Sequence, residues 1–131
     1  MPFPTDVEHT DRAAAKLGVA FSASYVERIL RENGGTVEVD GDEWQLYPVF
    51  DDTDAKRAKR TCNDVVRETA EARTWPTFPG DAVAIACDGS GDLLVMLTDS
   101  APALGAPIYK WSHESGDLVC LAGDLAELDA G

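Results

Sequence analysis

Five consecutive apolar residues, Leu93-Leu94-Val95-Met96-Leu97, constrain the fold more than any other stretch of this chain. A strand that is apolar on both faces has to be covered on both sides, so we expect it near the centre of a sheet, under helices. The run follows a Gly- and Asp-rich segment, 88–92, and a second apolar stretch, Ala82–Cys87, precedes that segment. Together they predict a central antiparallel hairpin.

Two further hairpins are predicted on either side of the central one. Val37 and Val39 alternate with polar residues and lead into Asp40-Gly41, a frequent hairpin turn, so that 43–49 is the expected returning strand. Near the end of the chain, 108–113 and 118–122 flank a turn at Glu114-Ser115-Gly116-Asp117. The sequence therefore predicts a mainly antiparallel sheet of about six strands.

Helix signals surround these hairpins. The Thr5–Glu8 spacing and Gly18 predict a helix over 6–17. Ser24 and Glu27 predict the start of a second helix, which Asn33-Gly34-Gly35 would end. Helical spacing of apolar residues predicts a third helix over 54–73, and a short last helix is expected from Asp124. The order of elements predicts an α+β fold, with one domain over residues 1–131 and helices packed on the sheet.

The charge of the chain excludes several classes of function. Twenty-four acidic residues against eleven Lys and Arg give a formal net charge of -13. Binding to nucleic acid depends on cationic side chains that neutralise phosphates, so nucleic acid is not expected as a partner, and neither is an anionic membrane surface. The sequence has no secretory signal pattern and no apolar run long enough to span a membrane, so we expect a cytoplasmic protein.

The acidic residues are unevenly distributed. From 38 to 54 the chain has seven acids and no base; the acids are Glu38, Asp40, Asp42, Glu43, Asp51, Asp52 and Asp54. From Asp81 to the end, Lys110 is the single Lys or Arg among nine acids. The bases gather at 56–60 (Lys-Arg-Ala-Lys-Arg), which is typical of a solvated face with local ion pairs. This uneven charge distribution influences which partners the protein attracts and how soluble it is.

No pattern of catalytic or metal-binding residues stands out. His113 next to Ser112, or across a hairpin from Cys120, is a conceivable nucleophile pair, but nothing supplies an oxyanion hole. The 88–92 segment has some features of a calcium loop, yet it lacks the bidentate Glu of an EF-hand, so a turn is favoured. The three cysteines are odd in number and form no CxxC pair, so reduced core thiols are expected. We therefore predict no enzyme activity, cofactor or metal.

Three segments, in order, resemble the SUKH superfamily, which includes the Smi/Knr-type cell-wall regulators. Leu17-Gly18-Val19 followed by 25–35 (Tyr-Val-Glu-Arg-Ile-Leu-Arg-Glu-Asn-Gly-Gly) is similar to the family's helix with its Asn-Gly-Gly stop. Segment 86–94 is similar to its Gly-Asp hairpin, and 108–114 (Ile-Tyr-Lys-Trp-Ser-His-Glu) to its aromatic strand, with 124–128 in place of its closing helix. One departure is Ala20-Phe21, where the family usually has Leu-Pro.

The resemblance implies an α+β fold without enzymatic activity. In bacteria it implies immunity proteins that bind and neutralise toxins, many of them nucleases, and in fungi regulatory scaffolds. An acidic face fits the first role, because it can compete for the cationic groove of a nuclease. The alternative is a regulatory or scaffold protein whose acidity serves solubility or adaptation to high salt.

On the immunity hypothesis, the partner is a toxin domain encoded nearby. We expect the acidic 38–54 segment to be the main contact, followed by the loop after Thr98 and the 114–117 turn. Trp and Tyr are frequent hot-spot residues at interfaces, so two tryptophans join the candidates. The predicted contact residues are Glu38, Asp40, Asp42, Glu43, Trp44, Asp51, Asp52, Asp54, Asp99, Trp111, Glu114 and Asp117.

Overall fold

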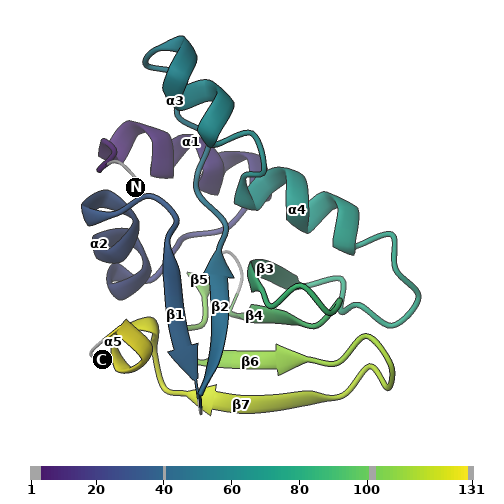
Figure 1. Ribbon diagram of the computed structural model, residues 1–131. Helices are drawn as coiled ribbons and strands as arrows, with labels where there is room; N and C mark the ends of the chain where they lie inside the picture. The colour runs from purple at the N-terminus through teal and green to yellow at the C-terminus, as the bar shows by residue number, and fades with distance from the viewer. Residues whose placement is uncertain (1–3, 40, 101–102, 130–131) are drawn as a thin grey trace.

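A computed structural model describes residues 4–39, 41–100 and 103–129 (Figure 1). In chain order the elements are α1 (Val7–Leu17), α2 (Ala23–Arg31), β1 (Thr36–Val39), β2 (Asp42–Leu46), α3 (Ala55–Arg60), α4 (Val65–Ala72), β3 (Ala82–Cys87), β4 (Leu93–Ser100), β5 (Ala103–Leu104), β6 (Ile108–Trp111), β7 (Leu118–Ala122) and α5 (Leu125–Asp129). This arrangement confirms the predicted α+β class.

The described strands form one antiparallel sheet in the order β1-β2-β3-β4-β6-β7, with β5 paired to β4. The five-residue apolar run, 93–97, lies in β4, between β3 and β6, and its residues from Leu93 to Met96 are buried. β3 is buried from Ala82 to Ala86. The predicted central hairpin is therefore confirmed, and its apolar residues form the middle of the core.

The helices cover the sheet in two groups. α4 packs on β3 and contacts α1, while α5 contacts α2, β1 and β7 (Figure 1). Because β1 and β7 are the two edge strands, α5 touches both ends of the curled sheet. Among the described residues, no helix is both long and apolar enough to cross a membrane.

The starts and ends of the first two helices largely follow local signals. Gly18 ends α1 with a left-handed φ of 71°. The cap of α2 is Ser22, whose hydroxyl accepts a hydrogen bond from the Tyr25 N–H, so the predicted start at Ser24 is two residues late. Asp6 precedes α1 without a side-chain cap, and the Thr5 hydroxyl, part of the predicted start signal, donates instead to the distant Asp51 carboxylate.

The predicted single helix over 54–73 is wrong, because the chain forms two helices there. The Thr61 hydroxyl donates to the Arg57 carbonyl and accepts from the backbone N–H of Asp51, which holds the end of α3 against a distant segment. Asp64 then caps α4 by accepting a hydrogen bond from the Arg67 N–H. A second cap inside the predicted helix therefore starts a new helix instead of continuing the first.

The cysteine prediction is correct in part. The three thiols are free, but Cys62 and Cys120 are exposed and only Cys87 is partly buried. Cys62 lies in the break between α3 and α4, and Cys120 lies on the edge strand β7, which pairs on one side only among the described strands. Their apolar surroundings in the sequence did not indicate these positions.

Candidate functional site

The exposed acids of the β1–β2 hairpin form the first part of the candidate site. Glu38 lies directly opposite Glu43 in the antiparallel register, and Val39 lies opposite Asp42. All three acidic side chains are exposed. Like charges directly opposite each other destabilise a sheet, so this pair adds nothing to folding. Asp40, also predicted as a contact, lies outside the described residues.

The two tryptophans predicted as contacts are core residues, which corrects that part of the prediction. Trp44 is 2% exposed and Trp111 1% exposed. Trp111 stacks on Trp75 with ring centroids 5.6 Å apart, meets Phe78 edge-on, and donates its indole N–H to the Thr77 carbonyl. A partner therefore cannot reach either ring while this conformation holds.

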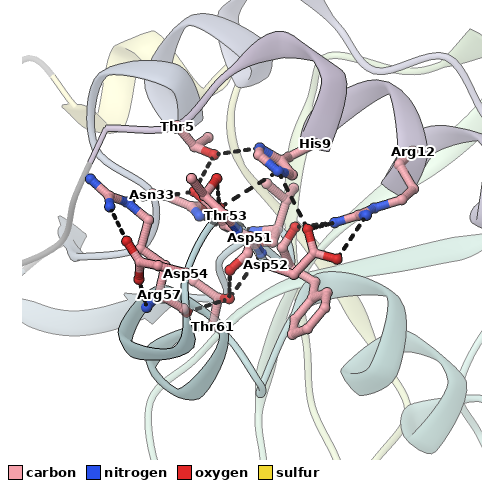
Figure 2. A network of polar contacts seen from close by, with 12 residues as sticks. Thr5, His9, Arg12, Asn33, Asp51, Asp52, Thr53, Asp54, Arg57 and Thr61 are labelled. Atoms are coloured by element: carbon pink, nitrogen blue, oxygen red, sulfur yellow. Dashed lines mark hydrogen bonds and ion pairs between the residues drawn. The ribbon is translucent and has the colours of Figure 1, made fainter.

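Asp51 is also buried, and it is the centre of a polar network (Figure 2). Its carboxylate accepts hydrogen bonds from the Thr5 hydroxyl at 2.8 Å and from the Thr53 hydroxyl and N–H at 2.6 and 3.0 Å. The Nε2 atom of His9 lies 3.5 Å away, and the Nε atom of Arg57 4.0 Å away. This carboxylate is a structural group, and the prediction that it contacts a partner is corrected.

The surroundings of Asp51 also decide its ionisation. Burial by itself raises the pKa of a carboxyl group, but here the hydrogen bonds from Thr53 and Thr5 and the nearby His9 ring outweigh it. The pKa of Asp51 is therefore below its usual range. The ionised carboxylate links Thr5, just before α1, and His9 of α1 to the segment between β2 and α3.

Asp52 and Asp54 remain at the surface, but both are paired with arginines of this chain. Arg12 of α1 holds Asp52 through both guanidinium nitrogens, at 3.2 and 3.3 Å, and lies over the Phe50 ring. Asp54 caps α3 by accepting from the Arg57 N–H, and its second oxygen lies 2.6 Å from the Arg57 guanidinium. The hydrogen bond from Arg12 lowers the pKa of Asp52, and that from the Arg57 backbone lowers the pKa of Asp54.

Sequence reasoning did not predict a structural or functional role for two residues near Asp51, namely His9 and Asn33. His9 is 5% exposed and Asn33 7% exposed. The Asn33 side chain makes two hydrogen bonds to the backbone of Val49, at 2.8 and 2.9 Å, and so fixes the chain just after β2. A signal for His9 was available in its spacing of four residues from Ala13, which places both on the buried face of α1.

A cleft of about 290 Å³ lies beside this network, between the end of α2, β2 and α3. Asn33, Asp51 and Thr61 line it, and each is bonded to the backbone or side chains of the neighbouring segments. Their polar groups are therefore already used to hold the acidic segment in place.

One group of three possible metal ligands comes together in the described part of the chain. Asp6, Glu8 and His9 can bring their ligand atoms within 4.8 Å of one another. The two ring nitrogens of His9 already face the Thr5 hydroxyl, at 3.1 Å, and the Asp51 carboxylate, at 3.5 Å. A metal at this place would have to displace one of these contacts. The arrangement of His9 therefore suits a structural role better than metal binding.

The second acidic region lies at the β6–β7 turn. Glu114 and Asp117 are exposed, as a contact surface requires. Asp99 belongs to β4, and its side chain lies outside the described residues. These three residues therefore stay predictions as partner contacts, together with the acids of the β1–β2 hairpin.

His113 has a structural partner across the sheet. Its Nδ1 atom lies 2.6 Å from Oδ1 of Asp92, and its backbone N–H donates to the same oxygen. Burial raises the pKa of Asp92, but these bonds from His113 outweigh it and leave the pKa below its usual range. Within the described residues, no serine or cysteine side chain is bonded to His113, so the nucleophile pairs considered from the sequence are not assembled.

Comparison with known proteins gives one match that covers nearly the whole chain. The model of the SMI1 / KNR4 family (SUKH-1) matches residues 4–128. No curated protein and no solved structure matches the chain.

Proposed function

Because the chain belongs to the SMI1/KNR4 (SUKH-1) family, we propose that it is a non-catalytic protein-binding domain that acts as an immunity protein. Its partner would be a cognate toxin domain, encoded nearby and presenting a cationic, nuclease-type groove. The proposal places both proteins in the cytoplasm, where the toxin would act.

The observation that carries this proposal is the exposed, like-charged pair of Glu38 and Glu43 on the β1–β2 hairpin. Their repulsion costs stability in the free protein, and a cation from a partner would relieve it. Asp42 adds a third exposed acid at the same hairpin. In contrast, Asp52 and Asp54 are paired with arginines of the chain. The hairpin is therefore the part of the 38–54 segment best suited to meet a basic surface.

The net charge of -13 would help this binding kinetically. Complementary fields raise the rate of encounter between proteins by about 10–10³-fold and act mainly on association. Affinity then has to come from closer contacts. Since Trp44 and Trp111 are buried, those contacts would be made by other exposed groups.

Co-expression with the C-terminal domain of the protein encoded next to this gene tests the proposal. We expect the domain to stop growth when expressed alone, growth to resume with this chain, and the two proteins to elute as one complex in gel filtration at low salt. The proposal fails if growth stops regardless of this chain and no complex forms.

The alternative is a regulatory or scaffold protein of the same family, whose acidity serves solubility or tolerance of high salt. A toxin gene immediately upstream would argue against the scaffold role. The dependence of stability on salt separates the immunity role from adaptation to high salt. A protein adapted to high salt unfolds when salt is removed, because its own negative charges then repel one another without screening. On the immunity proposal, the chain stays folded at low salt, and circular dichroism during dialysis measures this.

A further inference from the structure

The two edge strands of the sheet differ in how they are protected. α5 contacts both edge strands, and β1 also carries the exposed Glu38. β7 reads Leu-Val-Cys-Leu-Ala and has no charged residue and no proline. Edge strands usually carry charges, prolines, bulges or a covering element, because their free backbone groups otherwise pair with other chains. The first half of β7 has none of these protections in the described structure.

The side chains of β7 are open to solvent on both faces of the strand. Leu118 is 37% exposed and Val119 55% exposed, and Cys120 is exposed as well. Successive side chains of a strand point to opposite faces, so this run of three leaves both faces uncovered. Ile108 pairs with Ala122 and Tyr109 with Cys120, so the extra residue of the β6–β7 register is Leu121 of β7. This bulge lies in the second half of β7, and residues 118–120 pair regularly with β6.

The backbone groups of β7 that face the free edge can be assigned from the register. The Ser112 N–H donates to the Asp117 carbonyl at 3.0 Å and its carbonyl accepts from the Gly116 N–H at 2.7 Å, so Ser112 is a hydrogen-bonded position of the ladder. Bonded and non-bonded pairs alternate along an antiparallel ladder. Val119 is therefore bonded to Lys110, whereas Leu118 and Cys120 direct their N–H and C=O groups away from β6, toward the open edge.

Charge at the two ends of β7 indicates which kind of partner fits. The exposed acids Glu114 and Asp117 precede the strand, and Asp124 and Glu127 follow it. The ammonium of Lys110, on β6, is paired with Asp92 at 3.7 Å. A second copy of this chain would bring the same acids and a net charge of -13 to the edge, and that repulsion disfavours self-pairing.

We infer that β7 is a docking edge at which an extended segment of a partner protein, apolar in its middle and basic at both ends, adds as a further strand. The inference deepens the protein-binding role proposed above and rests on it. Main-chain hydrogen bonds to Leu118 and Cys120 would hold the segment, as in other cases of strand addition. The Val119 side chain would contact every second side chain of the added segment, those that point to its face of the sheet. The flanking Lys or Arg residues would meet the acids at each end.

A synthetic peptide, Lys-Arg-Val-Thr-Val-Thr-Val-Arg-Lys, tests this edge directly by NMR with the isotopically labelled full chain. We expect the amide signals of residues 118–120 to shift on titration.

Cys120→Pro removes an N–H that faces the open edge and leaves the β6 ladder intact, so we expect binding to weaken about tenfold or more. Val119→Lys places a like charge against the basic peptide, so it weakens binding too. Val7→Lys is the matched control at another exposed valine and leaves binding unchanged.

Three results would overturn the inference: no shift in β7, equal affinity of wild type and Cys120→Pro, or a dimer of wild type alone that Cys120→Pro dissociates. Should Cys120→Pro fail to fold, Val119→Lys against Val7→Lys decides. Binding of the toxin domain, measured with the same variants, separates this inference from the proposed function. A toxin complex unaffected by Cys120→Pro and Val119→Lys contradicts only the docking edge, whereas peptide binding at β7 without any toxin complex contradicts only the immunity role.

Discussion

At the scale of single residues, Asp51 shows how an acidic segment can be both structural and exposed. Asp51 is 3% exposed and its carboxylate is surrounded by donors from Thr5 and Thr53, while its neighbour Asp52 lies at the surface. A buried charge is tolerated only when it is hydrogen-bonded and paired, and this one satisfies both conditions. The network holds residues 51–54 against α1.

Replacing Asp51 by Asn should destabilise the protein by about 2 kcal/mol, because an amide N–H₂ would face hydroxyl and N–H donors. Urea unfolding followed by circular dichroism measures the loss. Asp52→Asn is the matched control, since it removes a charge one residue away from a screened surface pair, and its effect should be much smaller. Equal effects of the two substitutions would contradict a structural role for Asp51.

The pH dependence of stability should reveal the same carboxylate. The pKa of Asp51 is lowered in the folded protein, so its contribution is complete above the unfolded value of about 3.9 and is lost as the pH falls through the folded value. Wild type should therefore lose stability steeply below about pH 4. Thermal melting of Asp51→Asn over the same range should give a flatter acid limb, and an unchanged slope would show that other carboxylates account for it.

Residue-level roles were the hardest to predict from the sequence. The sequence does not distinguish a surface aspartate from a buried one such as Asp51, which bonds to a threonine forty-six positions away. Trp44 and Trp111 were predicted as contacts because tryptophan is frequent at interfaces, yet both are buried. Such assignments depend on long-range packing, which local patterns do not contain.

At the scale of elements, local chemistry was a good guide wherever it alone decides the structure. Gly18 ends α1, the 88–92 segment links β3 to β4, and Asp124 accepts from the Glu127 N–H at the start of α5. The break between α3 and α4 could not be predicted in this way. It depends on the hydrogen bond between the Thr61 hydroxyl and the distant Asp51 N–H together with the Asp64 cap of α4.

The cap at Asp64 should be a separate source of stability for α4. Asp64→Ala removes the acceptor for the Arg67 N–H and should cost about 1 kcal/mol. Glu71→Ala, an exposed position near the other end of the same helix, is the control and should have little effect. If chemical denaturation gave the same midpoint for Asp64→Ala and wild type, α3 and α4 would be divided by Thr61 alone.

At the scale of the whole molecule, the hairpin signals and the central apolar strand were enough to predict the α+β class and the antiparallel sheet. The resemblance to the SUKH superfamily, found in three short segments, is confirmed by a family match over residues 4–128. The sequence did not reveal that α5 contacts both edge strands or that no strand of the described residues pairs with the outer side of β7. Both depend on how distant elements pack, which local patterns do not contain.

The net charge and its placement lead to the central claim, that an acidic hairpin attracts a basic partner protein. The most direct test is the rate of association with the neighbouring gene's toxin domain, measured by stopped flow over a range of ionic strength. Wild type should associate fast and slow down steeply with salt, since screening weakens the attraction. The double variant Glu38→Gln with Glu43→Gln should associate more slowly, by about tenfold at low salt.

The control, Glu27→Gln with Glu71→Gln, removes two exposed charges elsewhere and should remain close to wild type. A rate that does not depend on salt, or equal slowing by both double variants, would contradict the account.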